Sequence, residues 1–262
     1  MRCIVTGAAR GIGRAIALRI ARDAAAQGGA QLALADVHAH ELATLQDELQ
    51  ALGSSAITVT GDLADAAFPA RLCAAAVAAF GGLDAVVSNA GLATPGLLAD
   101  YTVEAWDRVF AVNTRAPWLL AQAAYPALRD ARGALLLVAS ISATHATSPL
   151  GAYSPSKAAA LMLVRQLAGE WGPDGIRVNA LSPGLTLTPG TAVAYADPQA
   201  RAQREQRVPL RRLAEPEDMA AVAAFLIGPD AAYVSGAELQ VDGGLGQTLM
   251  GSLPMAGWKT IK

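Results

Sequence analysis

A tyrosine and a lysine four residues apart, Tyr153 and Lys157, are the side chains whose types and spacing most clearly suggest chemistry. Residues four apart on a helix lie on one face and close enough to interact. Tyrosine titrates near about 10 and is a poor base at neutral pH, but a neighbouring ammonium stabilises its phenolate and lowers its pKa. The pair is therefore expected to move a proton at a substrate oxygen.

Such a pair alone is more often an exposed surface pair, so the residues before it decide the interpretation. Ser140 ends an apolar run thirteen residues before Tyr153. A serine hydroxyl at a strand end could hold the substrate oxygen beside the tyrosine. Ser142 is the rival for this position, but the spacing to Tyr153 favours Ser140. His145 is either a substrate ligand or a surface loop residue.

A glycine-rich turn near the start of the sequence supplies the second decisive feature. Residues 6–13 read Thr-Gly-Ala-Ala-Arg-Gly-Ile-Gly and lead directly into an amphipathic segment. Glycines such as Gly7, Gly11 and Gly13 allow a tight turn and let a pyrophosphate approach backbone N–H groups at a helix N-terminus. Glycine turns are common, so the motif depends on its context. Here it predicts a dinucleotide site.

An acidic residue after the second apolar run indicates which dinucleotide binds. Asp36 lies where an adenosine ribose would offer its hydroxyls, and it would repel a 2′-phosphate, which favours NAD over NADP. Arg10, in the glycine turn, could instead meet that phosphate. Asp36 is the stronger indication, because its repulsion of a 2′-phosphate would act at close range. The alternative is that Asp36 is an ordinary turn residue at a strand end.

Polar residues also follow the third and fourth apolar runs. They are Asp62, with Leu63 after it, and Asn89, which precedes Ala90 and Gly91. Ligands of open α/β sheets bind outside the carboxyl ends of the strands, so these residues are expected at the adenine and ribose. Each could equally be a helix cap or a turn residue.

Elements of two kinds alternate along the chain and must position these groups. Short, nearly continuous apolar runs predict buried parallel strands, and longer Ala-rich segments between them predict helices. The pattern indicates an α/β fold: a doubly wound parallel sheet of the Rossmann type, about seven strands, with helices on both faces. The expected strands are 3–6, 31–35, 56–60, 85–88, 134–139, 176–181 and 238–241. The expected helices are 13–26, 40–52, 69–80, 116–129, 154–171 and 215–227.

The domain organisation follows from the same alternation of predicted strands and helices. We expect a single dinucleotide-binding and catalytic domain over residues 1–262, because no linker or internal repeat interrupts the alternation. Residues 185–213, with three prolines and several arginines, break the rhythm and are expected to form a substrate lid. Residues 245–262 form an apolar tail, expected to pack across a subunit interface or over the substrate pocket.

Composition excludes several classes of protein. Hydrophobic residues make up 53% and charged residues 16% of the 262, which excludes intrinsic disorder. The net charge of -2 gives no reason to expect a nucleic-acid partner, and no apolar stretch is long enough to span a membrane. Two cysteines and three histidines predict neither disulfides nor a metal site. With a motif starting directly at the N-terminus, we expect a cytoplasmic protein.

These motifs together resemble the short-chain dehydrogenase/reductase family, in its compact single-domain branch. The resemblance runs from Val5 to Gly244. In order and spacing it is highly specific. The motifs that carry it are Thr6-Gly7-x-x-x-Gly11-x-Gly13, Asp62, Asn89-Ala90-Gly91, Asn113, Ser140, Tyr153-x-x-x-Lys157, Pro183-Gly184, the segment 212–218 and Val241-Asp242-Gly243-Gly244. One departure is an excess of about five residues around 22–29.

The resemblance implies the roles of the catalytic residues. Tyr153 would be the general acid and base, and Lys157 would bind the nicotinamide ribose and depress the tyrosine pKa. Ser140 would orient the carbonyl or alcohol. Asn113 would hold a water molecule that links Lys157 to solvent, although a helix-stabilising polar residue is the alternative.

Further residues are implied at the cofactor and the substrate. Thr188 would contact the carboxamide of the cofactor, with Thr186 as a second candidate. The remaining cofactor-binding residues are Gly7, Arg10, Gly11, Ile12, Gly13, Asp36, Asp62, Leu63, Asn89, Ala90, Gly91, Tyr153, Lys157, Pro183 and Gly184. The expected substrate contacts are Ser140, Ser142, His145 and Tyr153.

Three functions follow, in order of preference. The first is an NAD-dependent oxidoreductase that transfers a hydride to or from a secondary alcohol or ketone, with a small-molecule substrate and no metal. The second is an NADP-dependent 3-oxoacyl reductase, whose acyl carrier the arginines of 201–212 could serve, unless they are solvated helix faces. The third is a non-catalytic dinucleotide sensor, which would be expected to have lost Ser140, Tyr153 or Lys157.

A homotetramer, or at least a dimer, is expected from the helix over 154–171. It is apolar around much of its circumference, and one sheet face cannot cover every side of such a helix. In the family, this helix and the one over 116–129 usually pair with their symmetry mates.

Overall fold

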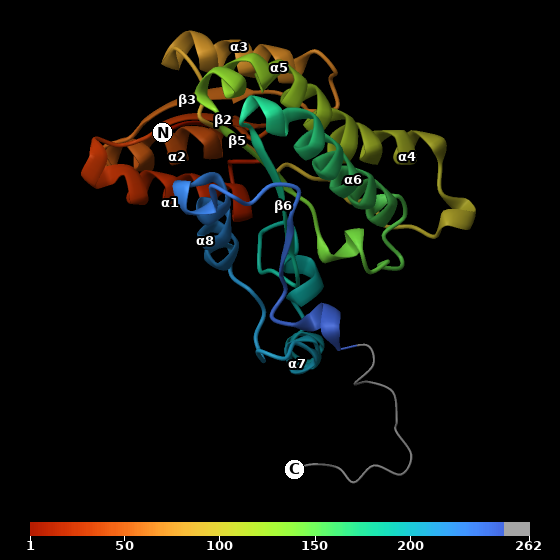
Figure 1. Cartoon of the computed structure of the whole chain (residues 1–262). Coiled ribbons are helices and arrows are strands. Elements are labelled where there is room, and N and C mark those ends of the chain that lie inside the picture. Colours follow the sequence, from red (N-terminus) through yellow and green to blue (C-terminus); the bar gives the residue numbers. More distant parts are fainter. Residues whose placement is uncertain (249–262) are drawn as a thin grey trace.

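A seven-stranded parallel sheet forms the centre of the molecule (Figure 1) in a computed structural model that describes residues 1–248. The strand order is β3-β2-β1-β4-β5-β6-β7. The strands are β1 Arg2–Thr6, β2 Gln31–Asp36, β3 Ser55–Thr60, β4 Ala85–Ser88, β5 Ala134–Val138, β6 Arg177–Pro183 and β7 Glu238–Val241. This arrangement confirms the predicted doubly wound sheet.

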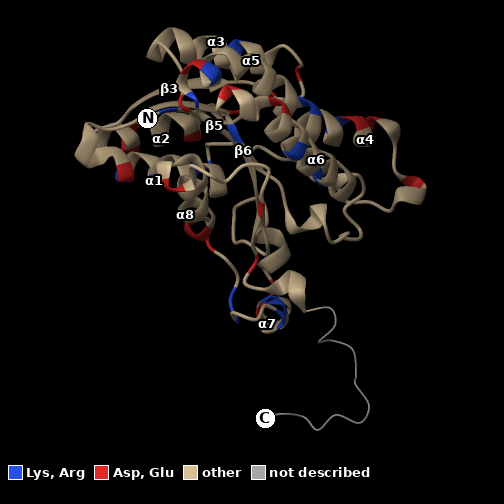
Figure 2. Cartoon of the chain, viewed as in Figure 1, with Lys and Arg blue, Asp and Glu red and all other residues tan. Residues whose placement is uncertain are grey.

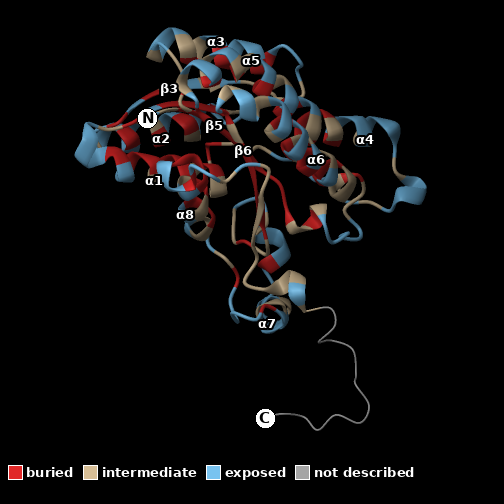
Figure 3. Ribbon diagram, viewed as in Figure 1, coloured by how far each residue is buried: buried red, intermediate tan, exposed pale blue. Residues whose placement is uncertain are grey.

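Helices cover both faces of the sheet and enclose two separate apolar cores. They are α1 Gly11–Ala24, α2 Ala39–Ala51, α3 Phe68–Phe80, α4 Val103–Phe110, α5 Ala116–Ala131, α6 Tyr153–Trp171, α7 Pro198–Arg207 and α8 Pro216–Ile227. Helices α1, α2 and α8 supply one core, and α3, α5 and α6 supply the other. Figure 3 shows the buried strands between the two helical layers, whose outer surfaces are exposed.

Strands β4 and β5 are buried at every position because both of their faces are covered. All five residues of β5, Ala134–Val138, are buried, as are all four of β4. Continuous apolar runs are what such strands require. Each predicted strand and helix begins and ends within two residues of its observed bounds. The excess around 22–29 forms a short 3-10 turn after α1, followed by Gly28 and Gly29 at positive φ.

Helix α4 was not expected from the sequence. It has only eight residues, and Thr102 caps it by accepting a hydrogen bond from the amide of Ala105 at 3.2 Å. A π-helical turn, Ala111–Arg115, joins α4 to α5. Short segments of this kind carry too few periodic positions to stand out in a sequence.

The direction of winding reverses between β1 and β4, which are neighbours in the sheet. From β1 the chain proceeds through β2 to β3 on one side, and β4 begins the other side. Such a switch point leaves a crevice outside the carboxyl ends of the strands, where ligands of this fold bind. The glycine turn after β1, Asn89 after β4 and Ser140 after β5 all lie at this edge.

The expected lid, residues 185–213, contains a 3-10 turn, Ala192–Tyr195, and helix α7. Figure 1 shows α7 set apart from the helices that cover the sheet, and Figure 2 shows basic residues on it. Its action as a lid stays a prediction. Of the apolar tail, Leu245–Gln247 form a 3-10 turn, and residues 249–262 lie outside the described part of the chain. No helix within residues 1–248 is long and apolar enough to cross a membrane.

Candidate active site

The glycine turn after β1 has no space for side chains at its critical positions. Gly7 and Gly11 have φ angles of +63° and +57°, which side chains rarely adopt. A Cβ atom on Gly13 would lie 2.2 Å from the carbonyl oxygen of Gly7. The turn leads into α1, whose N-terminus receives no side-chain cap from the described residues. Its first amides are therefore available to an anion such as a pyrophosphate.

Asn89 and Thr6 hold the glycine turn in place. The Asn89 amide donates to the carbonyl oxygens of Thr6 at 2.9 Å and Gly7 at 3.2 Å. The Thr6 hydroxyl accepts from the backbone amides of Asn89 and Ala90 at 3.0 and 3.1 Å. The sequence places Asn89 at the adenine or ribose, whereas in the structure its amide group binds the turn itself. The glycine motif alone does not indicate this role of the Thr6 hydroxyl.

Asp36 ends β2 beside the glycine turn. One carboxylate oxygen accepts from the amide of Ala9 at 3.1 Å, and the other accepts from Val37 at 2.8 Å and His38 at 3.2 Å. The carboxylate is thus fixed at the rim of the crevice, while its predicted contact with the adenosine ribose stays a prediction. Arg10 lies on the same rim, with its guanidinium 3.4 Å from Glu41 of α2.

Asp62 behaves as a turn residue, the alternative left open for it. Its carboxylate accepts from the amide of Ala64 at 2.9 Å and from the Arg108 guanidinium at 2.7 Å. The backbone hydrogen bond and Arg108 hold the pKa of this carboxyl below its usual range. Its carboxylate therefore holds the turn, and its predicted contact with the cofactor stays a prediction, while Leu63 packs partly buried against the core.

Ser140, Tyr153 and Lys157 come together at the carboxyl end of β5. Ser140 follows the strand directly, and α6 begins at Tyr153. Lys157, one turn further along α6, is buried and donates to the carbonyl oxygen of Val138 at 2.8 Å. Its ammonium nitrogen lies 5.8 Å from the centre of the Tyr153 ring. The three groups predicted to act together therefore face one another.

Burial dominates the ionisation of this cluster. It lowers the pKa of Lys157 to about 8, because the ammonium has lost its water. Burial also raises the pKa of Tyr153, and a side-chain hydrogen bond with Ser140 lowers it by less. Burial outweighs this hydrogen bond, so the pKa of Tyr153 in the chain alone lies above its usual value, and the expected lowering by Lys157 stays a prediction.

Asn113 lies in the π-helical turn and is buried. Its amide donates to the carbonyl oxygen of Leu92 at 2.8 Å and to the Ser156 hydroxyl at 2.9 Å, and its oxygen accepts from the amide of Leu92 at 2.8 Å. Asn113 therefore ties the loop after β4 to α6. A Cβ on Gly91 would lie 3.3 Å from the Lys157 ammonium, so this loop passes directly over the lysine.

The chain after β6 approaches the glycine turn from the other side. The Thr188 side chain would contact a Cβ on Gly11 at 3.2 Å, which places Thr188 over the turn. Thr186 is buried, and its hydroxyl donates to the carbonyl oxygen of Gly184 at 3.2 Å. Gly184 is needed because its Cβ would lie 2.6 Å from Cα of Asp242. Of the two candidate threonines, Thr188 is the better placed.

Polar side chains line the loop between Ser140 and α6. Ser142 is buried and shares a hydrogen bond of 2.7 Å with the Thr147 hydroxyl, and its backbone amide donates to the Ser140 oxygen. His145 is exposed and lies 3.0 Å from the Thr144 hydroxyl. Ser142 thus shapes the loop that presents Ser140, while His145 remains available at the surface.

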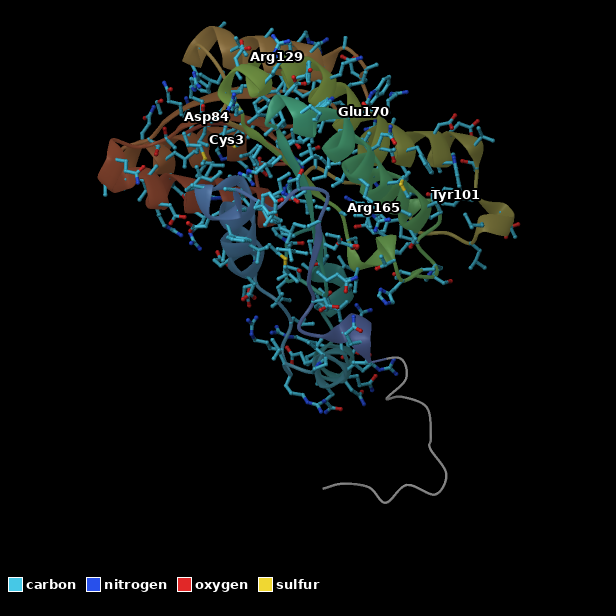
Figure 4. All side chains as sticks on the ribbon, viewed as in Figure 1. Cys3, Asp84, Tyr101, Arg129, Arg165 and Glu170 are labelled. Atoms are coloured by element: carbon cyan, nitrogen blue, oxygen red, sulfur yellow. The ribbon has the colours of Figure 1, made fainter. Side chains whose placement is uncertain are left out.

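Two residues that support the site have no signal in the sequence. Tyr101, labelled in Figure 4, donates to the carbonyl oxygen of Thr94 at 2.9 Å. Its ring fills the space that side chains on Gly96 and Gly151 would need, so it joins the loops on either side of the expected pocket. Ser156 is fully buried and links Asn113 to the first turn of α6. Only the folded chain brings these partners together.

Comparisons with known proteins agree with this geometry. A family model described as "Enoyl-(Acyl carrier protein) reductase" matches residues 7–246. An L-rhamnose 1-dehydrogenase (NAD(P)(+)) of Sphingomonas is 39% identical over 92% of this chain and 94% of its own length. Dehydrogenase/reductase SDR family member 4 of Sus scrofa is 36% identical over 94% of this chain and 87% of its own. The Pseudomonas aeruginosa RhlG/NADP complex is 31% identical with a TM-score of 0.86, covering 93% and 95% of the two chains.

Proposed function

The chain belongs to the short-chain dehydrogenase/reductase family, and from this premise we propose how its site carries out the reaction. It is an NAD(P)-dependent oxidoreductase that acts on the CH–OH group of an alcohol. The observation that carries the proposal is the convergence of Ser140, Tyr153 and Lys157 beside the glycine turn. Tyr153 is the proposed general acid and base.

In the oxidation direction, the Tyr153 phenolate accepts the proton of the substrate hydroxyl. The Ser140 hydroxyl donates a hydrogen bond to the substrate oxygen and holds it beside the tyrosine. Lys157, fixed by the carbonyl oxygen of Val138, supplies a positive charge that favours the phenolate over the phenol. Reduction reverses these proton movements. Bound nicotinamide supplies the hydride acceptor or donor.

The described residues fit a dinucleotide. Uncapped amides at the start of α1 would hold its pyrophosphate, and the tight approach of Gly13 to Gly7 keeps the turn free of side chains. Lys157 would hold the nicotinamide ribose, and Thr188, above Gly11, would contact the carboxamide. Asp36 would receive the adenosine ribose.

We propose NAD as the preferred cofactor, because the Asp36 carboxylate, held at the rim of the crevice, would lie beside the adenosine ribose and repel a 2′-phosphate. The Pseudomonas relative holds NADP, and the Sphingomonas relative carries both cofactors in its name. Steady-state assays with each cofactor test the preference. Equal or better use of NADP would overturn it.

The alternatives from the sequence are not favoured. The Sphingomonas relative is named for rhamnose. A relative from Sphingobium indicum, 33% identical over 92% of this chain, is named for a diol, although the description of the family model names an acyl-carrier reductase. A non-catalytic sensor is not favoured either, because Ser140, Tyr153 and Lys157 are all present and assembled. The cytoplasmic location stays a prediction.

A panel of sugars, cyclic diols and hydroxy acids, followed by NADH absorbance, tests the reaction. We expect turnover with a secondary alcohol that carries further hydroxyl groups, since Ser142, His145 and Thr147 make the adjacent loop polar. Absence of any NAD- or NADP-dependent turnover across the panel would contradict the proposal.

We propose that the chain assembles as a homotetramer, with a second copy covering a groove between α4, α5 and α6. The groove has a volume of about 800 Å³, and Trp118 and Met162 expose 45% and 58% of their surfaces there. The apolar face of α6 is narrower than the sequence suggests. Arg165 and Glu170, labelled in Figure 4, are exposed on this helix, while Leu161 and Val164 pack into the core.

Light scattering at micromolar concentration tests the assembly. We expect about four times the monomer mass for the unmodified protein. A Met162→Glu variant, which adds a charge to the groove, is expected to dissociate. Val193→Glu, an equally apolar and exposed position outside the groove, is not. A monomeric unmodified protein would overturn the proposal.

A further inference from the structure

Arg10 has an incompletely satisfied side chain at the rim of the cofactor crevice. Its terminal nitrogen lies 3.4 Å from a carboxylate oxygen of Glu41, and both side chains are about half exposed. Its Nε atom is buried and finds no hydrogen-bond partner among residues 1–248. A buried donor without an acceptor is costly, and a guanidinium can bind two oxygens of one anion. With 41% of its side chain exposed and a single contact of 3.4 Å, the Arg10 guanidinium therefore has capacity for another anionic partner.

The position of Arg10 identifies that partner. The preceding residue, Ala9, donates its amide to the carboxylate of Asp36, so Arg10 begins next to the expected ribose position. Glu41 lies in the first turn of α2, which follows β2 and Asp36. The rim of the crevice thus brings together the glycine turn with Arg10, the end of β2 with Asp36 and the start of α2 with Glu41. An anion reaching Arg10 there would be a phosphate monoester on the adenosine ribose, as in NADP.

Glu41 and such a phosphate would compete for the same guanidinium. With Glu41 in contact, part of the positive charge of Arg10 is already neutralised, and a phosphate must displace the carboxylate to gain its hydrogen bonds. NAD makes no such demand, because its ribose carries only a hydroxyl. The contact therefore weakens binding of the phosphorylated cofactor and leaves that of NAD nearly unchanged.

We propose that Glu41 is a specificity-determining residue, which acts through Arg10 by restraining its guanidinium and so disfavours NADP. This inference rests on the proposed function, since it concerns the adenosine end of the same cofactor site. Asp36 is the proposed direct determinant, and Glu41, in the first turn of α2, is a positioning residue.

Calorimetric dissociation constants for NAD and NADP test the proposal without turnover. Glu41→Gln keeps the size of the side chain and removes its charge. We expect it to tighten NADP binding about two- to fivefold, the effect of an exposed ion pair, with little change for NAD. A merely structural role would alter both constants together.

The matched control is Glu48→Gln. Glu48 also joins α2 to α1, through hydrogen bonds of 2.6 and 2.9 Å to Arg14, and the substitution makes the same change in net charge. We expect no change in the ratio of the two constants. An equal shift in both variants would reveal a general charge effect and overturn the proposal.

A double variant separates action through Arg10 from direct repulsion. In the Arg10→Met background, Glu41→Gln is expected to have no effect on NADP binding, because the guanidinium that it would release is gone. A gain that persists there would overturn the proposal, as would no gain in Glu41→Gln alone. Failure of the unmodified protein to bind either cofactor would instead contradict the proposed function.

Discussion

The two halves of the crevice are held in different ways. Around β1, the glycine turn is fixed by backbone geometry: positive φ angles, amide contacts from Asn89 and a Gly13 that almost touches Gly7. Around β5, buried functional groups define the site, with Lys157 and Tyr153 both shifted in pKa by desolvation. The cofactor half should therefore be intolerant of added volume, and the chemical half intolerant of a changed functional group.

Replacing Tyr153 by Phe gives the largest expected effect. The loss of the hydroxyl removes the group that moves the proton, so kcat should fall by about 10²–10⁴-fold. The ring stays, so the melting temperature and the dissociation constant of the cofactor should change little. Steady-state kinetics with calorimetry measures all three. Near-normal turnover would show that the chemical half does not depend on this group.

The pH dependence of the oxidation rate should reflect the buried groups around β5. Oxidation requires the Tyr153 phenolate, and burial raises the pKa of this phenol, so the rate should climb with pH, up to about tenfold per unit. The climb should flatten above the pKa of Lys157, about 8, as the ammonium loses its charge. Initial rates from pH 6 to 10 measure this. In Lys157→Met the flattening near pH 8 should be absent, and its persistence would contradict the assignment.

Added volume should damage the cofactor half. Gly13→Ala places a methyl group where the Gly7 carbonyl lies, which should lower the free energy of unfolding by about 1–3 kcal/mol and weaken cofactor binding. Gly169→Ala is the matched control, since its Cβ would meet nothing within 4 Å and it lies inside α6. That change should stabilise the protein by about 0.5–1 kcal/mol. Urea unfolding of both variants decides. Equal free energies of unfolding for the two variants would show that the glycine turn is not limited by the space at Gly13.

Asp36→Ala should have the smallest of the effects predicted for the crevice. It removes both the ribose acceptor and the charge that repels a 2′-phosphate, so NAD should bind about three- to tenfold more weakly while NADP gains. The measurement is the ratio of kcat/KM for the two cofactors. If the ratio is the same as in the unmodified protein, Asp36 does not contribute to the choice of cofactor.

The sequence predicted the sheet and most of the helices because the signal for each is local. Apolar runs such as 134–139 and the periodic segments between them identify the elements without knowledge of their neighbours. Helix α4 could not be predicted because its eight residues span too few helical turns to show a periodic apolar pattern. The bracing contacts of Tyr101 and Ser156 escaped because they join segments that are distant along the chain.

The chemical groups of the site and their order can be read directly from the amino-acid sequence: a glycine turn, an acidic residue after the second strand, then Ser140, Tyr153 and Lys157 at fixed spacing. Such features follow from chain geometry, because a strand end or a helical turn fixes the direction of its own side chains. The environment of these groups arises only when the chain folds. It buried Lys157 and Tyr153, bound the amide of Asn89 to the turn and set Glu41 against Arg10. Burial, charge pairing and steric exclusion depend on neighbours from other elements, which no single stretch of sequence contains.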